Sequence, residues 1–135
     1  MVKYTLLEIQ EILTETQAIL EAEIEGDNMA MIIDHANLLA SRLAISGKLL
    51  SDAKFRRSER YGPAVMEMLQ KATSEEMYAD AQKKYLMSLT KDYDYLIDWA
   101  ERTNATLTHL LDYMRSLLSK EKELMKMKSL PDPTH

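Results

Sequence analysis

Cysteine is absent from this chain of 135 residues, and glycine and proline occur only three times each. Without cysteine there are no disulfides, no thiolate metal sites and no cysteine nucleophile. The scarcity of turn-forming residues is typical of a helical protein and argues against a β fold with many turns. No apolar run approaches the about 18 residues that a membrane-spanning helix needs, and the opening residues do not form a signal peptide. We therefore predict a cytoplasmic protein that makes no contact with membranes.

The longest stretch without glycine or proline runs from Thr73 to about Lys128. Apolar residues recur along it at heptad spacing for about five repeats, and a second row widens this seam into a stripe. About 50 residues at a rise of about 1.5 Å make a helix on the order of 75 Å long, which needs an equally long partner from its own chain or from another copy. We predict self-association through this stripe, which consists of Leu86, Leu89, Tyr93, Leu96, Ile97, Leu107, Leu110, Leu111, Met114, Leu117, Leu118 and Leu124.

Capping signals and helix breakers set the predicted helix limits. Thr5 with Glu8, and Thr73 with Glu76, have the spacing of a capping box, in which each side chain accepts a hydrogen bond from the backbone of the other residue. Gly26 and Pro63 are expected to end helices, because glycine favours a left-handed cap and proline disfavours helical backbone before it. The prediction is one helical domain over 1–128, with helices at about 5–25, 29–61, 64–72 and 74–128, and a disordered tail at 129–135.

These elements predict an all-α fold, an elongated antiparallel helical hairpin or bundle with one very long C-terminal helix. Because the predicted second helix is much shorter than the last one, we expect a second copy to cover the remaining stripe in a dimer or higher oligomer. Gly47 lies inside the second helix and indicates either a close helix crossing or a local kink. Thr103, Asn104 and Thr106 interrupt the long stripe with a polar layer that can fix register or oligomeric state, the alternatives being a solvent-filled notch or a local bend.

Charge is distributed unevenly along the chain. Residues 1–34 contain eight acidic residues and one lysine, a net charge of −7 within a total of −5. The densest basic cluster could bind phosphates and stack an aromatic ring on a base, and we predict a possible nucleic-acid contact at Lys54, Arg56, Arg57, Arg60 and Tyr61. Two alternatives remain open: cations near a helix end favoured by the helix dipole, and cations paired with the acidic first helix of the same or another copy.

Residues arranged for catalysis are missing from the pattern. Neither internal histidine, His35 or His109, follows a glutamate by three residues, so the Glu-x-x-His pair of helical metal sites is absent. Carboxylate pairs such as Glu8 and Glu11 fall outside the apolar stripes, so we expect them to lie on a solvated face of the helix. No Gly-rich loop offers a phosphate cradle, and no strained turn offers an activated serine. We predict that the protein is not an enzyme and uses no metal and no cofactor.

The long predicted helix closes on the run Leu110-Leu111-Asp112-Tyr113-Met114-Arg115-Ser116-Leu117-Leu118-Ser119-Lys120-Glu121. This run resembles the end of a group of small all-helical proteins of unknown function from phages and prophages, which are encoded near recombination genes. The order of elements from about Met29 onward resembles that group too, whereas the break at Tyr61-Gly62-Pro63 departs from it. The resemblance implies an all-helical protein of phage or mobile-element origin, and it transfers no catalytic or binding residue.

Three interpretations of function follow from these patterns. The leading one is a non-enzymatic interaction or adaptor protein that acts by helix–helix recognition and self-association, with a further protein partner of unknown identity. The second is a nucleic-acid-binding accessory protein in phage recombination or replication. The third is an acidic mimic of DNA that inhibits a host nuclease through Glu8, Glu11, Glu15, Glu21, Glu23 and Glu25.

Overall fold

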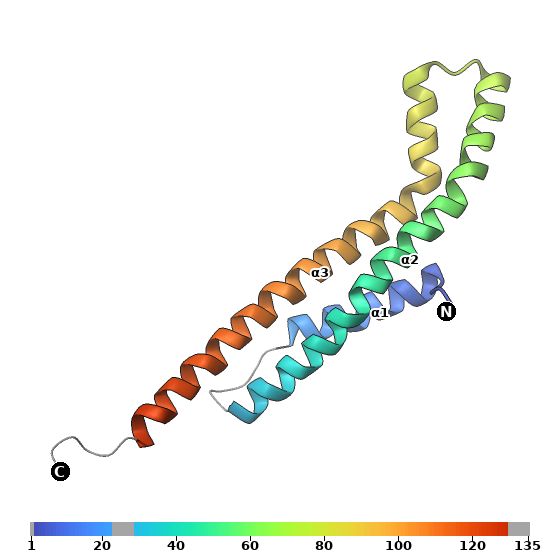
Figure 1. Ribbon diagram of the computed structural model, residues 1–135. Helices are drawn as coiled ribbons and strands as arrows, with labels where there is room; N and C mark the ends of the chain where they lie inside the picture. Colours follow the sequence, from blue (N-terminus) through green and yellow to red (C-terminus); the bar gives the residue numbers. More distant parts are fainter. Residues whose placement is uncertain (1, 23–28, 130–135) are drawn as a thin grey trace, which may run out of the picture.

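The computed structural model describes residues 2–22 and 29–129. Three helices follow one another in the chain: α1 (Leu6–Glu21), α2 (Met29–Glu75) and α3 (Ala79–Ser129). Figure 1 shows α2 and α3 as a long antiparallel hairpin, with α1 packed along the half that lies away from the connecting turn. The predicted all-α, elongated hairpin with a long C-terminal helix is confirmed.

The start of α1 follows its capping signal. The Thr5 hydroxyl accepts a hydrogen bond from the Glu8 N–H at 3.2 Å, and the Glu8 carboxylate accepts one from the Thr5 N–H at 3.2 Å. These two bonds satisfy backbone donors that a helix leaves unpaired in its first turn. The helix ends at Glu21, earlier than predicted, and the expected stop at Gly26 lies outside the described residues.

The predicted break at Tyr61-Gly62-Pro63 is wrong, because α2 runs through it to Glu75 and includes the short helix expected at 64–72. A proline inside a helix removes one hydrogen bond and crowds the preceding turn, which bends the helix. Figure 1 shows such a change of direction in the green part of α2. Ala64, the next residue, is fully buried, and packing against α3 on both sides of the bend keeps the helix continuous.

The chain reverses at residues 76–78, not at Thr73. The Thr73 hydroxyl donates to the Leu69 carbonyl at 2.8 Å inside α2 and caps no helix. Instead, Glu76 takes a left-handed conformation with φ of 53°, and the Met77 N–H donates to the Ala72 carbonyl at 3.1 Å. This is the geometry of a Schellman cap, which usually has glycine at the left-handed position. Because no glycine marks this turn in the sequence, the predicted start of the long helix was five residues too early.

The part of the hairpin that α1 accompanies, residues 29–63 and 90–129 with α1 itself, is called the body here, and residues 64–89 are called the tip. The body has two apolar clusters. One joins Ile9 and Leu13 of α1 to α2 and α3, and the other joins α2 to α3 further from the turn. Their buried members are Ile9, Leu13, Leu49, Ala53, Leu96 and Ala100 in the first, and Ile32, Leu39, Leu107, Leu111 and Met114 in the second.

The predicted polar layer lies between these two clusters. The Asn104 side-chain amide donates to the Ser46 hydroxyl at 2.7 Å, and Ser46 donates to the Leu43 carbonyl at 2.9 Å. Thr16 of α1 and Thr103 of α3 are buried at the same level. An amide that bonds to a buried hydroxyl only in one alignment favours one register of two helices, and here the half-buried Asn104 does so with the buried Ser46 of α2 in the same chain.

The two long helices are nearly equal in length, 47 residues in α2 and 51 in α3. The fusion of the predicted second and third helices therefore supplies the equally long partner from within the chain. Along most of α3, the difference in helix length that led us to expect a second copy is therefore absent. Near the end of α3 the stripe is again uncovered, and 42% of Leu124 is exposed.

Gly47 does not mark a close helix crossing within the described part of the chain. The helix is continuous through it, and a Cβ atom added at this position would have no heavy atom within 4 Å. No described segment of the chain approaches Gly47 closely, so its backbone is open on the surface of α2.

Candidate functional site

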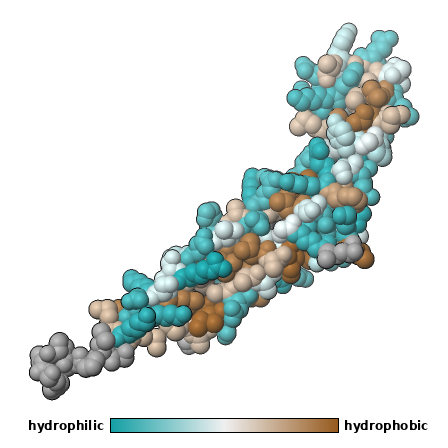
Figure 2. All heavy atoms as spheres, in the orientation of Figure 1, coloured by the Kyte–Doolittle hydropathy of each residue, from teal (hydrophilic) through white to brown (hydrophobic). Residues whose placement is uncertain are grey.

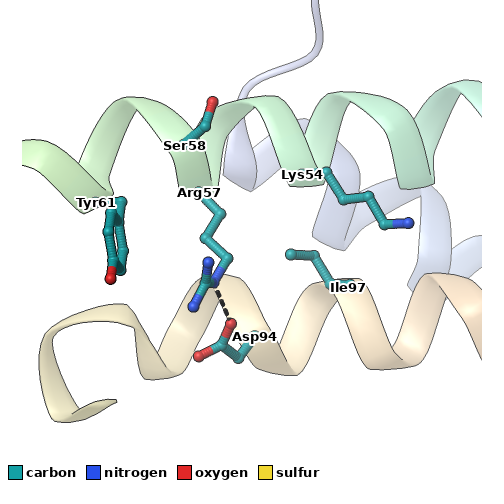
Figure 3. Close-up of a pocket in the computed structure, with 6 residues that line it drawn as sticks. All are labelled: Lys54, Arg57, Ser58, Tyr61, Asp94 and Ile97. Atoms are coloured by element: carbon teal, nitrogen blue, oxygen red, sulfur yellow. Dashed lines mark hydrogen bonds and ion pairs between the residues drawn. The ribbon is translucent and has the colours of Figure 1, made fainter. Parts of the chain in front are cut away.

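The two faces of the hairpin differ because α1 covers only one of them. Leu6 of α1 lines a groove with Pro63 of α2 and Tyr93 of α3, and Leu20 lines another with Trp99. On the opposite side, a groove between α2 and α3 is lined by Lys54, Arg57, Ser58, Tyr61, Asp94 and Ile97, with no described residue of α1 among them. Figure 3 shows this groove from the front, with the pale-blue ribbon of α1 behind the two long helices.

This uncovered side is called the free face. Residues at spacings of three and four from the groove continue it along both helices. It carries Tyr61 at the end of the body and Leu69 and Met87 on the tip, which are 44%, 47% and 59% exposed. In Figure 2, where the side opposite α1 faces the reader, brown apolar patches lie on the body and on the tip. The free face consists of Ile33, Ala36, Ala40, Leu43, Gly47, Leu50, Lys54, Arg57, Tyr61, Val65 and Leu69 of α2 and Met87, Thr90, Asp94, Ile97 and Glu101 of α3.

Ion pairs between helices cross the groove. Arg57 Nε donates to Asp94 Oδ1 at 2.5 Å, as Figure 3 shows, and the Thr90 hydroxyl donates to the other oxygen of Asp94 at 3.1 Å. Lys54 Nζ lies 3.9 Å from a Glu101 oxygen. The bases come from α2 and the acids from α3, so the two ion pairs together have no net charge but place one sign on each helix.

The predicted nucleic-acid contact is divided between two faces. Lys54, Arg57 and Tyr61 line the groove of the free face, and the Arg57 guanidinium lies 5.5 Å from the centre of the Tyr61 ring. Arg56 and Arg60 point to the side of α1 instead. Since successive residues of a helix point about 100° apart, a cluster that is dense in sequence is spread around the helix.

Arg56 and Arg60 are held by partners in the chain. Arg56 Nε donates to the Tyr4 carbonyl at 2.9 Å, which attaches the extended residues before α1 to α2. Arg60 donates two hydrogen bonds to the Glu67 carboxylate, at 2.8 and 3.2 Å. These bonds lower the pKa of Glu67. Neither arginine joins the groove, so both serve the fold in this conformation.

Asp52 of α2 also holds the extended residues before α1. Asp52 is only 3% exposed. Its carboxylate accepts hydrogen bonds from the Tyr4 N–H, at 2.9 Å, and from the Lys48 ammonium. Burial alone would raise the pKa of Asp52, but the bonds from Lys48 and Tyr4 and the positive charge of Lys48 outweigh it and lower the pKa. Lys48 also donates to the Val2 carbonyl at 3.1 Å. The start of α1 is thus attached to α2 by polar bonds, and the rest of α1 by apolar packing.

The predicted self-association stripe faces into the molecule. Leu96, Leu107, Leu111 and Met114 are buried under α1 and α2, and Leu124 is exposed. The remaining members are half-buried, namely Leu86, Leu89, Tyr93, Ile97, Leu110, Leu117 and Leu118. Apart from Ile97, the free face lies beside this stripe. The sequence did contain a sign of the free face, namely apolar residues that do not belong to the predicted buried rows, such as Tyr61, Leu69 and Met87.

The acidic residues of α1 point away from the hairpin. Glu8, Glu11, Glu15 and Glu21 are exposed, and Glu15 lies 3.4 Å from Arg42 of α2. Glu23 and Glu25 lie outside the described residues. The interpretation of this segment as a mimic of DNA stays a prediction, with part of its charge already paired to the chain's own α2.

Within residues 2–22 and 29–129, His, Asp and Glu side chains form no group of three that could hold a metal ion. Over the same ranges, no helix has the apolar stretch required to cross a bilayer. Comparison of the chain with protein-family models, with curated proteins and with solved structures finds no match.

Proposed function

We propose that this protein is a non-enzymatic interaction module of the cytoplasm that acts by helix–helix recognition and self-association. The observation that supports the proposal is the half-covered hairpin: α1 packs on one face, and the free face presents apolar side chains of two long helices. Burying such side chains stabilises association by roughly 25 cal/mol per Å², and the ion pairs along the face would select the partner. A further protein partner would use the same kind of helix packing.

Light scattering behind a sizing column tests the proposal at tens of micromolar. A self-associating protein should elute with at least twice the chain mass of 15.6 kDa. Because the contact is largely apolar, the mass should persist in about 1 M salt, where the Debye length is only about 3 Å. A monomer at both low and high salt would contradict self-association.

A second candidate function is nucleic-acid binding in recombination or replication, the setting that the resemblance to phage proteins implies. It is favoured by one observation, the meeting of Lys54, Arg57 and Tyr61 in one groove. Against it, Asp94 and Glu101 neutralise the two cations, which leaves the groove without the net positive charge that phosphates attract.

Fluorescence anisotropy with labelled single- and double-stranded oligonucleotides at about 50 and 200 mM salt tests this candidate. Binding through phosphates should weaken steeply between these concentrations. It should be lost in Lys54→Ala/Arg57→Ala and kept in Arg102→Ala/Arg115→Ala, a matched control that removes two exposed cations elsewhere on α3. Equal loss in both variants would indicate non-specific attraction, and no binding at 50 mM would exclude the groove as a nucleic-acid site.

A further inference from the structure

We infer that the free face binds a second copy of this chain, stacked so that α2 of each copy lies over α3 of the other. The inference rests on the proposed self-association and specifies its surface, its symmetry and the residues in contact. The result is a four-helix bundle of two hairpins, with each α1 on the outside.

The charges of the free face select this arrangement. Arg57 and Asp94 lie at the same level of the hairpin, since they are paired, and so do Lys54 and Glu101. A two-fold axis parallel to the helices keeps levels unchanged and exchanges α2 with α3. It therefore places the bases of each copy against the acids of the other. An axis across the helices lays α2 on α2 and brings the bases together when it is centred on the groove, where like charges repel.

The exposed apolar residues of the body fit the same symmetry. The axis runs parallel to the body helices, so the bend in α2 turns the two tips apart and the contact is confined to the body. Tyr61 lines the groove and is 44% exposed, and Ile33, near the other end of α2, is 40% exposed. Stacking α2 over α3 brings both side chains against α3 of the other copy. A face with exposed apolar residues and compensating charges is self-complementary, as a two-fold interface requires.

The dimensions of the face reach the lower end of the range for a specific dimer. In the body, its α2 part from Ile33 to Tyr61 is about 40 Å long and its α3 part from Thr90 to Glu101 is about 17 Å long, at a rise of about 1.5 Å per residue and a helix diameter of about 10 Å. The footprint is thus on the order of 600 Å², about what each partner buries at the lower end of specific complexes. The exposed backbone at Gly47, where an added Cβ would meet no atom of the chain, lies within this footprint.

Charge exchange gives the sharpest test. In the acidic variant, Lys54→Glu/Arg57→Glu, both helices of the face carry acids; in the basic variant, Asp94→Lys/Glu101→Lys, both carry bases. Each variant alone should be monomeric in light scattering at low salt, whereas a one-to-one mixture should recover the dimer. Circular dichroism and a melting curve establish that each variant is folded. A dimer of either variant alone, or no dimer in the mixture, would overturn the arrangement.

Two apolar substitutions test the face without altering the ion pairs. Ile33→Glu and Tyr61→Glu should each weaken the dimer about tenfold or more, because a charge would be buried without a partner. Leu7→Glu on the outer side of α1 and Tyr95→Glu beside Trp99 are controls, being 65% and 63% exposed in the parent and lying away from the free face. These controls should leave the mass unchanged.

The outcomes separate this inference from the function on which it rests. A parent protein that is monomeric throughout would contradict both. A parent dimer that survives Ile33→Glu, Tyr61→Glu and the acidic variant would leave self-association standing and reject the free face. If the acidic variant instead loses oligonucleotide binding while its mass stays that of the parent, the groove is a nucleic-acid site and the inferred dimer is wrong.

Discussion

The body and the tip are built from the same two helices, yet they differ in how completely they bury their residues. In the body, α1 closes one side of the hairpin and several side chains lose all contact with solvent. In the tip, only Ala64, next to the body, is fully buried, and no residue from 65 to 89 is. Two helices meet along a line and leave both faces open, whereas a third helix encloses a volume.

This difference separates stability from recognition. Enclosed side chains contribute the full free energy of transfer from water, so the body is expected to hold the fold together. The tip contributes less and exposes more apolar surface, including Tyr78 and Met87. Exposed apolar patches that the fold does not use often mark interaction sites, and they are the surfaces on which the proposed function depends.

Truncation of matched leucines would break this comparison most directly. Leu107→Ala removes a fully buried side chain of the body and should lower the free energy of unfolding by about 2–5 kcal/mol. Leu86→Ala, at a half-buried position of the tip, should cost only about 1 kcal/mol, in proportion to the smaller area lost. Urea unfolding followed by circular dichroism measures both. Equal costs would show that the tip is as well packed as the body.

Asp52 is expected to give the body a stronger pH dependence than Glu67 gives the tip, because Asp52 is buried and Glu67 is not. Its pKa in the folded protein is lowered, below the about 3.9 of an unfolded chain. Its stabilising effect is therefore fully present above that value and is lost as the pH falls through the folded pKa. At pH 7, Asp52→Asn should cost about 1–3 kcal/mol, since it weakens hydrogen bonds to a charged acceptor.

The difference in the free energy of unfolding between the parent and Asp52→Asn should then decrease as the pH is lowered. Unfolding curves at several pH values between 7 and 2 measure the convergence. A difference that stays constant over this range would show that the carboxylate charge contributes nothing and that shape alone matters. Glu67→Gln in the tip is the comparison: the pKa of Glu67 is lowered too, but its carboxylate is much more exposed, so the corresponding difference should be smaller at every pH.

Pro63 lies at the border between body and tip, where the hairpin bends. Proline inside a helix destabilises the folded state by about 3 kcal/mol relative to alanine. Alanine in turn makes the unfolded chain more flexible, which favours unfolding by up to about 1 kcal/mol. Pro63→Ala should therefore raise the free energy of unfolding by about 1–2 kcal/mol and align the tip with the body. Small-angle scattering would show a longer maximum dimension. A loss of stability would mean that contacts on both sides of the bend depend on it.

The smallest expected effect lies at the end of the tip. Glu76 has a left-handed backbone, which costs a residue with a Cβ atom about 1 kcal/mol and glycine very little. Glu76→Gly should stabilise the protein by up to about 1 kcal/mol, and Glu75→Gly, inside the last turn of α2, should destabilise it by a similar amount. Thermal melts of the pair measure both signs. Two destabilised variants would show that the Glu76 side chain contributes to the turn.

The apolar periodicity of the chain predicted the fold class and the inward stripe of α3, and Thr5 with Glu8 predicted the start of α1. Both depend on neighbours within a few residues, so the sequence contains the information. The candidate site was predicted only in part. Lys54, Arg57 and Tyr61 were named, but their separation from Arg56 and Arg60 depends on where α1 packs. Leu69, Met87 and Asp94 were not recognised, because their exposure depends on the partner helix.

By itself, then, the sequence determined which segments are helical, which stripe is apolar and where α1 begins, since these follow from local spacing and capping bonds. Only the tertiary structure decided that α2 continues through Pro63 and that the chain turns at Glu76. It also decided that one face of the hairpin stays open. The physical reason is that each of these outcomes balances a local cost, a proline in a helix or a left-handed glutamate, against burial between segments distant in sequence.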